Sequence, residues 1–270
     1  MLEISDLKKT FHPGTVNEVR ALRGVTLTIE DGTFTGVIGT NGSGKSTLLN
    51  AVAGTFHPDS GRIVLNGHDI TNAAEYRRAS HIGRVFQDPF AGTAADMSIA
   101  ENIVMSMRRG HRHGFGKALT RKTREEMREK VRALNMGLED RLDNPIGTLS
   151  GGQRQALTLL MATWLRPDIL LLDEHTAALD PKSAAKVAQL TSEIIRREKL
   201  TALMVTHSMQ QAVDMPDRII MMHRGRIAED FSGAQKSRIR IPDLMDAFDR
   251  VTKRDLLDES AAEMLNVQYM

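Results

Sequence analysis

A glycine-rich turn followed by a lysine and a hydroxyl residue lies at 39–46, with the spacing G-x-x-x-x-G-K-[ST]. An apolar run precedes the turn and Leu48-Leu49 follow it, so we expect the turn to join a strand to a helix. Glycines let backbone N–H groups face inward onto phosphate oxygens, and a helix N-terminus favours anions. The segment therefore predicts a nucleoside triphosphate site, in which Lys45 reaches the β- and γ-phosphates and Ser46 ligates Mg²⁺. The expected nucleotide contacts here are Gly39, Thr40, Asn41, Gly42, Ser43, Gly44, Lys45, Ser46 and Thr47.

Two carboxylates end a second apolar run, Ile169–Leu172. Such a run is typical of a buried strand, and ligands in parallel sheets bind beyond the carboxyl ends of the strands. Asp173 is suited to holding Mg²⁺ through water, and Glu174 to accepting a proton from an attacking water. Taken alone, the pair is equally compatible with a strand end capped by solvated acids.

A third candidate, Ser150-Gly151-Gly152-Gln153, follows Leu149 and opens a long apolar helix that reaches Leu165. Serine and two glycines at a helix N-terminus can form a second anion-binding end. The alternative is that Ser150 is only a helix N-cap, which would by itself explain these residue types.

The elements that must position these residues alternate between strand and helix at both ends of the chain. Between them, about 88–165 has a helical texture, which predicts an α/β fold with a helical insert whose flanks rejoin one sheet. We expect strands at 2–7, 25–29, 34–38, 63–65, 82–86, 169–172, 202–206, 219–223 and 226–228. We expect helices at 125–134, 150–165, 181–198 and over the last 30 residues.

Composition narrows the function classes. The 270 residues carry 36 Lys and Arg against 34 Asp and Glu, a net charge of +2, which provides no global basic field for nucleic acid. The absence of cysteine excludes disulfides and cysteine-built metal sites. No apolar run reaches the 18 residues or so of a membrane span, and no secretory signal is visible, so we expect a cytoplasmic address.

Together these motifs resemble the ATP-binding cassette (ABC) family, specifically the nucleotide-binding subunit of a membrane transporter, over about 2–231. Leu149-Ser150-Gly151-Gly152-Gln153 is similar to the family signature and lies about 20 residues before Asp173-Glu174. Gln87 matches the Q-loop glutamine, and Asp180 matches the D-loop. His207 matches the switch histidine, and Phe11 matches the aromatic that stacks on adenine.

The resemblance implies a P-loop NTPase fold, with a RecA-like core, an antiparallel β subdomain and an inserted α-helical signature subdomain. It also implies an ATPase domain at 1–235, with the helical subdomain at about 88–165, and a helical extension at 236–270. ATP and Mg²⁺ are the implied cofactors. The implied catalytic residues are Glu174, His207 and Gln87, and the implied metal ligands are Ser46, Gln87 and Asp173.

In this family two subunits pack head to tail, so each ATP would lie between 39–47 of one copy and 150–153 of the other. A homodimer is the expected assembly. The resemblance further implies integral membrane permease subunits, an extracytoplasmic substrate-binding protein and a place on the cytoplasmic face of the inner membrane. Uptake of amino acids or related small solutes is the expected transport activity.

Other functions remain open at this point. A soluble ABC ATPase of DNA repair or translation is disfavoured, because the chain has one cassette, no sustained heptads and near-neutral charge. A lipid-trafficking transporter is compatible with the sequence. A small-molecule kinase fits worst, because the signature and His207 would then have no task.

Two departures from the family pattern and two further segments carry weaker signals. His175 replaces the usual proline after the catalytic glutamate, and it either biases the local charge below about pH 6.5 or packs against a neighbouring loop. Phe11 replaces the usual tyrosine, with a core role as the alternative. The basic segment 108–124 is compatible with binding to anionic lipid headgroups or with a solvated loop. The tail from 242 suits packing on its own subunit or on a dimer mate.

Overall fold

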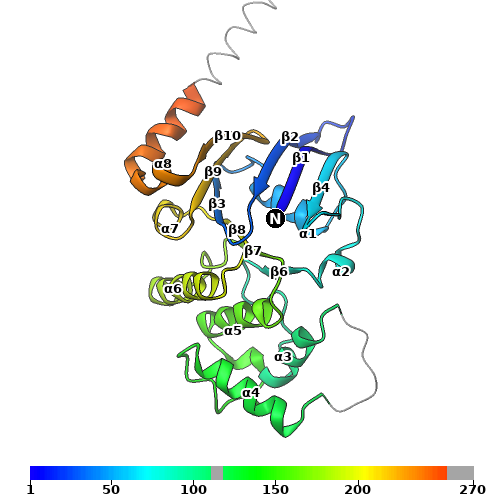
Figure 1. Ribbon diagram of the computed structural model, residues 1–270, viewed down its shortest axis with the longest axis vertical. Coiled ribbons are helices and arrows are strands. Elements are labelled where there is room, and N and C mark those ends of the chain that lie inside the picture. The colour runs from blue at the N-terminus through cyan, green and yellow to red at the C-terminus, as the bar shows by residue number, and fades with distance from the viewer. Residues whose placement is uncertain (111–117, 254–270) are drawn as a thin grey trace, which may run out of the picture.

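The computed structural model describes residues 1–110 and 118–253 (Figure 1). Its central element is a six-stranded sheet in the order β10-β9-β3-β8-β7-β6. Neighbouring strands are parallel, except that β10 is antiparallel to β9. The strands are β3 (Phe34–Gly39), β6 (Ile82–Val85), β7 (Ile169–Asp173), β8 (Ala202–Val205), β9 (Arg218–His223) and β10 (Arg226–Phe231). The parallel strands expected from continuous apolar runs are therefore confirmed.

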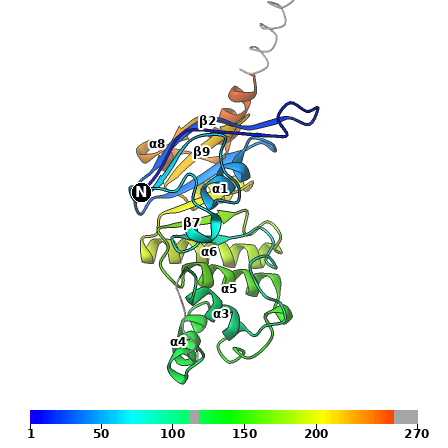
Figure 2. The same cartoon turned by 90° about the vertical axis from the view of Figure 1, so that its right-hand side faces the viewer.

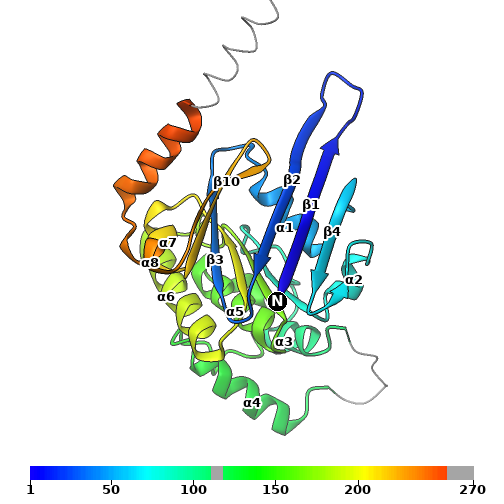
Figure 3. The ribbon, with the colours of Figure 1, turned by 45° about the horizontal axis from the view of Figure 1, so that its top comes forward.

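Side chains of the central strands alternate between two hydrophobic clusters, because successive residues of a strand point to opposite faces. On β7, Leu171 contributes to the cluster that contains α1 (Lys45–Ala53), whereas Leu172 contributes to the cluster that contains α5 (Gly151–Thr163). Helix α6 (Pro181–Glu198) lies on the α5 side. The sheet is thus covered on both faces, as Figures 1 and 3 show.

A second, antiparallel sheet of order β2-β1-β4-β5 covers α1 from outside. Its strands are β1 (Leu2–Phe11), β2 (Val19–Ile29), β4 (Ser60–Leu65) and β5 (His68–Asp69). The β1–β2 hairpin is several residues longer than expected, and it extends away from the body in Figure 3. The sequence hid this length because register shifts between Ile4 and Thr10 break the period-2 alternation.

The helical insert leaves the central sheet after β6 and rejoins it at β7, because these two strands pair, with Val85 opposite Leu172. It forms the end of the molecule opposite the antiparallel sheet (Figure 2). Its elements are α3 (Ile99–Met107), α4 (Arg121–Arg132), a 3₁₀ turn (Ile146–Thr148) and α5. The short α2 (Glu75–Arg78) precedes β6. The fold is mixed α/β, as predicted.

Part of the basic segment 108–124, residues 111–117, lies outside the described residues. Of the described basic residues, Arg121 pairs with Glu125 at 3.1 Å and Arg124 with Asp143 at 2.8 Å. The first pair lies within α4, and the second joins α4 to the connection before the 3₁₀ turn, so this portion of the segment interacts with acids of the helical insert.

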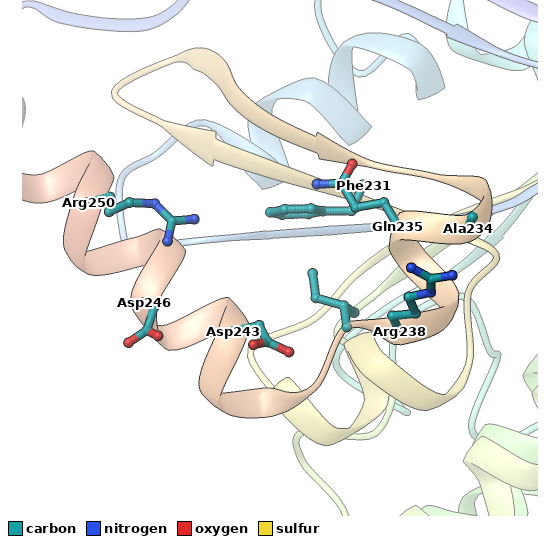
Figure 4. Close-up of a pocket in the computed structure, with 8 residues that line it drawn as sticks. Phe231, Ala234, Gln235, Arg238, Asp243, Asp246 and Arg250 are labelled. Atoms are coloured by element: carbon teal, nitrogen blue, oxygen red, sulfur yellow. The ribbon is translucent and has the colours of Figure 1, made fainter.

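The C-terminal extension packs on its own chain over its described part. After α7 (Met209–Asp214) and α8 (Gly233–Arg238), a helix covers 241–253. Leu244 and Ala247 are buried against Phe231 and β9. Phe248 and Val251 pack against the same cluster. Between α8 and this helix lies an open hollow of about 640 Å³, in which Arg238, Asp243 and Arg250 are exposed (Figure 4).

No helix among the described residues is both long enough and apolar enough to span a bilayer.

Candidate active site

The phosphate-loop candidate connects β3 to α1, as the sequence predicted. Gly44 is the residue before α1, and its φ of 100° is one that side chains rarely adopt. A Cβ there would lie 2.5 Å from the carbonyl oxygen of Ala21 on β2. The antiparallel sheet therefore presses directly on the loop, and only glycine fits at this point.

Lys45 is 5% exposed and is held inside the loop. Its Nζ donates to the carbonyl oxygens of Gly39 at 2.9 Å and Thr40 at 3.0 Å. Burial lowers the pKa of Lys45, and the nearby Glu174 carboxylate opposes this shift. An ammonium group has three N–H donors, so a buried lysine with two of them fixed in the loop is oriented to meet an anion with the third.

The first turn of α1 is open to an anion. No side chain among the described residues caps this helix, whereas Ser98, Ser150 and Asp180 cap α3, α5 and α6. Uncapped N–H groups and the helix dipole both favour a bound phosphate. The hydroxyl-bearing Ser46, in the same turn, is exposed.

The carboxyl ends of β7 and β8 bring Glu174 and His207 together. His207 Nε2 lies 2.7 Å from Glu174 Oε1. The Glu174 backbone has φ 45°, and its N–H donates to the carbonyl oxygen of Val205 at 2.9 Å. A non-glycine residue in this left-handed conformation is uncommon and is held by its surroundings. Sequence reasoning named both residues separately, and the strand order explains their contact.

Asp173 ends β7 beside Arg84 of β6, a residue that sequence reasoning missed. Arg84 Nη2 lies 3.7 Å from Asp173 Oδ2, and the same nitrogen donates to Asn50 Oδ1 of α1. Burial raises the pKa of Asp173, while Arg84 acts in the opposite direction. Arg84 is an isolated charge in the apolar run 82–86, which is the one signal that could have identified it.

Gln87 follows β6 and is exposed. The loop it begins is fastened to α5 at two points. Gln155 Nε2 donates to the carbonyl oxygen of Phe86 at 2.9 Å, and the Arg154 guanidinium lies 4.1 Å from the centre of the Phe90 ring. The Gln87 loop and the start of α5 are therefore physically linked, through two residues that the sequence did not single out.

Ser150 and Gln153 form a capping box at the start of α5. Ser150 Oγ accepts the Gln153 N–H at 3.3 Å and can still donate its own hydrogen. Asp180 caps the neighbouring α6 by accepting the Ser183 N–H at 3.0 Å. A Cβ on Gly152 would lie 2.8 Å from Ser183 Cβ, so glycine permits the close approach of the two helix starts.

Comparison with known proteins decides the family. The family model described as ABC transporter matches residues 22–177, more than half of the chain.

The chain belongs to the ABC transporter family.

Two curated members of the ABC family are similar along most of the chain. A tyrosine transport ATP-binding protein of Clostridioides difficile is 40% identical over 250 residues, covering 92% of this chain and 99% of the relative. A methionine import ATP-binding protein of Pseudomonas putida is 35% identical over 241 residues, covering 87% and 68%.

Among solved structures, the dimeric, post-hydrolysis state of an ATP-binding cassette bound to ADP and Pi is similar, with a TM-score of 0.74 and 26% identity. The match covers 86% of this chain and 98% of that one. The expected P-loop NTPase fold class is confirmed, and the chain is an ATP-hydrolysing cassette of the ABC family.

Phe11, the expected adenine contact of this ABC cassette, is half-buried at the end of β1. Its ring meets the Phe56 ring edge-on, with centroids 5.3 Å apart and an interplanar angle of 83°. Lys9 Nζ lies 5.6 Å from the Phe11 centroid. Phe56 was not expected here, because it reaches β1 from the loop after α1, whereas Lys9 lies two residues before Phe11 on the same strand.

His175, which replaces the family's usual proline, is 1% exposed. Its Nε2 lies 2.9 Å from Thr191 Oγ1 of α6, and that hydroxyl also donates to the Val187 carbonyl oxygen at 2.8 Å. Burial lowers the pKa of His175 to about 4. The imidazole is therefore neutral near pH 7, and packing describes it better than a bias of local charge does, although its contact is with α6 rather than with a loop.

Proposed function

We propose that this ABC ATPase powers solute uptake through a separate membrane permease, with Glu174 as the group that activates water. The observation that carries the proposal is the 2.7 Å contact between Glu174 and His207 at the carboxyl edge of the sheet where the Lys45 loop also lies. The two loops lie near each other because β3, which leads to Lys45, and β7, which leads to Glu174, both pair with β8. A base, an orienting histidine and a phosphate-binding lysine are thereby grouped at one site.

In the proposed nucleotide complex, the N–H groups at the start of α1 and the Lys45 ammonium bind the β- and γ-phosphates. The remaining loop residues 39–44, together with Thr47, surround them, and Phe11 stacks on adenine. Anion binding to these donors needs no movement of α1, because its first turn is already uncapped.

The residues also fit Mg²⁺, which prefers oxygen ligands and keeps several waters. Ser46 Oγ, the Gln87 side-chain oxygen and, through water, Asp173 would hold the ion. No group of three or more His, Asp or Glu side chains suited to a metal occurs in the described part of the chain, so phosphate oxygens and water would complete the shell. The ion would supply stabilisation of phosphate charge.

For hydrolysis, the Glu174 carboxylate accepts a proton from water as the water attacks the γ-phosphorus, and the bond from that phosphorus to the β–γ bridging oxygen breaks, so that ADP leaves and inorganic phosphate forms. His207, whose ring contacts Glu174, orients the carboxylate and faces the same phosphate. Gln87 relays the state of the site to the helical insert, through the loop that Gln155 and Arg154 fasten to α5.

The proposed active assembly contains two copies of the chain. Helices α1 and α5 belong to hydrophobic clusters on opposite faces of the sheet, so their two anion-binding ends do not converge within one chain. In a head-to-tail homodimer, Ser150, Gly151, Gly152 and Gln153 of one copy would close over the ATP bound at 39–47 of the other, with Asp180 beside them. The dimeric state of the similar cassette supports this arrangement.

The names of the similar proteins, tyrosine transport and methionine import ATP-binding proteins, support an amino acid or related small solute as cargo. The complete system would include permease subunits, an extracytoplasmic substrate-binding protein and a place on the cytoplasmic face of the inner membrane. We also propose the division into an ATPase domain, 1–235, its helical subdomain at about 88–165, and an extension, 236–270.

The test is ATP-dependent uptake into proteoliposomes that contain this chain, its co-purifying permease and a substrate-binding protein. Accumulation of labelled amino acid that requires ATP is the expected result. ATP hydrolysis without uptake of any amino acid tested would contradict the cargo class while leaving the ATPase intact.

A further inference from the structure

A second polar layer lies behind the contact between Glu174 and His207. It consists of Thr176, two residues after Glu174, Thr206, directly before His207, and Gln211 on the first turns of α7. Thr176 is 7% exposed and Thr206 is 4% exposed, so their hydroxyls depend on partners within the protein. Both threonines find that partner in one side chain, the Gln211 amide.

The amide of Gln211 joins the two loops. Its Nε2 donates to Thr176 Oγ1 at 2.9 Å, and Thr176 Oγ1 lies 3.2 Å from Gln211 Oε1. Thr206 Oγ1 donates to the same Oε1 at 3.3 Å. The backbone of Gln211 is also fixed, because its N–H donates to the capping hydroxyl of Ser208 at 3.3 Å.

Each threonine is tied to the backbone of a catalytic loop. Thr206 Oγ1 accepts the Ser208 N–H at 3.0 Å, which closes the turn that carries His207. The Ala177 N–H donates to the Glu174 carbonyl oxygen at 2.9 Å, so Thr176 lies inside the turn that begins at Glu174. This turn starts with the left-handed φ of 45° at Glu174, a conformation that surrounding contacts must maintain.

We propose that Gln211 is a positioning residue for ATP hydrolysis, which bridges the loops after β7 and β8 and so holds Glu174 and His207 at their working distance. The inference rests on the proposed roles of Glu174 and His207. The side-chain amide of Gln211 hydrogen-bonds to Thr176 and Thr206 rather than to Glu174 or His207, so Gln211 acts through the two threonines. Its absence would let the two loops move independently, and a displacement near 1 Å at a reacting group can cost about 10²-fold in rate.

A role limited to stabilising α7 would give a different signature. Loss of the bridge leaves the Lys45 loop untouched, so the KM for ATP should stay within about twofold while kcat falls. A residue that only stabilises the fold would lower the melting temperature, and the remaining folded protein would keep its kcat. The split between kcat and KM therefore separates the two roles.

The experiment compares steady-state ATP hydrolysis and melting temperature for Gln211→Leu and Gln210→Leu. Leucine removes the amide at similar volume. Gln210 is the matched control, because it precedes Gln211 on the same helix, is exposed and hydrogen-bonds to Asp214. We expect kcat to fall at least fivefold for Gln211→Leu with an unchanged KM, and to stay within twofold for Gln210→Leu. A smaller fall in kcat for folded Gln211→Leu overturns the proposal.

Thr206→Val provides a second route if Gln211→Leu fails to fold. It removes one hydroxyl of the bridge at nearly constant volume, and it should lower kcat in the same direction, with Gln210→Leu unaffected. Where both variants fold, the double variant should lose no more than the larger single loss, because one bridge is broken either way. Additive losses of kcat in the double variant, or a wild-type kcat in Thr206→Val, would overturn the proposal that Gln211 bridges the two loops.

Glu174→Gln separates this proposal from the proposed function. Near-normal hydrolysis in Glu174→Gln would remove the catalytic role on which the bridge depends. Loss of hydrolysis in Glu174→Gln with normal kcat in Gln211→Leu would overturn only the role of Gln211.

Discussion

Glu174 Oε1 and His207 Nε2 lie 2.7 Å apart, although 33 positions separate the two residues in the chain. Their contact exists because β7 and β8 are neighbours in a parallel sheet, so their carboxyl ends share an edge. The Lys45 loop follows β3, which pairs with β8 on its other side. Three successive strands of the sheet thus lead to a buried lysine, a histidine and a carboxylate at one edge, and each can be tested separately.

Removal of the Lys45 ammonium should weaken ATP binding. Lys45→Ala deletes a buried cation that the loop carbonyls orient, and charge-assisted contacts with phosphate are worth about 1.5–3 kcal/mol, so affinity should fall at least about tenfold. Isothermal titration calorimetry with ATP and Mg²⁺ measures it. Lys122→Ala, an exposed lysine on α4, is the control. Equal affinity in Lys45→Ala and the control would contradict the phosphate-loop assignment.

The Phe11 ring should contribute to nucleotide affinity. Stacking of a base on an aromatic side chain is worth about 1–3 kcal/mol, so Phe11→Ala should raise the Kd for ATP by about 5- to 150-fold. Phe11→Tyr retains the ring and should bind nearly as wild type does. If Phe11→Ala binds ATP normally but melts at a lower temperature, the contact with Phe56 is the whole role of Phe11.

His175 should make the fold sensitive to acid. Burial lowers its pKa from 6.5 to about 4, so its contribution to stability is complete above about pH 6.5. As the pH falls from 6.5 toward 4, the unfolded chain takes up a proton that the native chain does not, and this lowers the free energy of unfolding. The loss between pH 7 and pH 5 should be about 2 kcal/mol.

His175→Gln keeps a donor for Thr191 but does not titrate. Chemical unfolding at pH 7 and pH 5 should therefore show a smaller acid loss for this variant than for wild type. An identical acid loss in both proteins would mean that His175 is accessible to protons in the native state.

Local patterns predicted the parts of this molecule that local chemistry determines. The continuous apolar run at Ile169–Leu172 predicted a buried strand, and the helix expected at 181–198 matches α6, which has Pro181 at its first position. Short elements such as β5 and α2 were missed, because segments of two to four polar residues carry no periodicity.

Contacts between distant segments were beyond the sequence. Arg84 lies beside Asp173, and Gln211 joins Thr176 to Thr206, only because of the strand order. No spacing along the chain encodes that order. The roles of Gln87, Asp180 and His207 came from resemblance to a family rather than from residue chemistry, and they stay predictions until variants are measured.

The most direct test of the central claim is a comparison of ATP turnover and ATP-dependent dimerisation in wild type and Glu174→Gln. The substitution removes the base but keeps the shape of the side chain, so ATP should bind while hydrolysis falls by about 10²–10⁴-fold. Light scattering should then detect a dimer trapped by unhydrolysed ATP. Near-normal turnover in Glu174→Gln would contradict the assignment of Glu174 as the water-activating group.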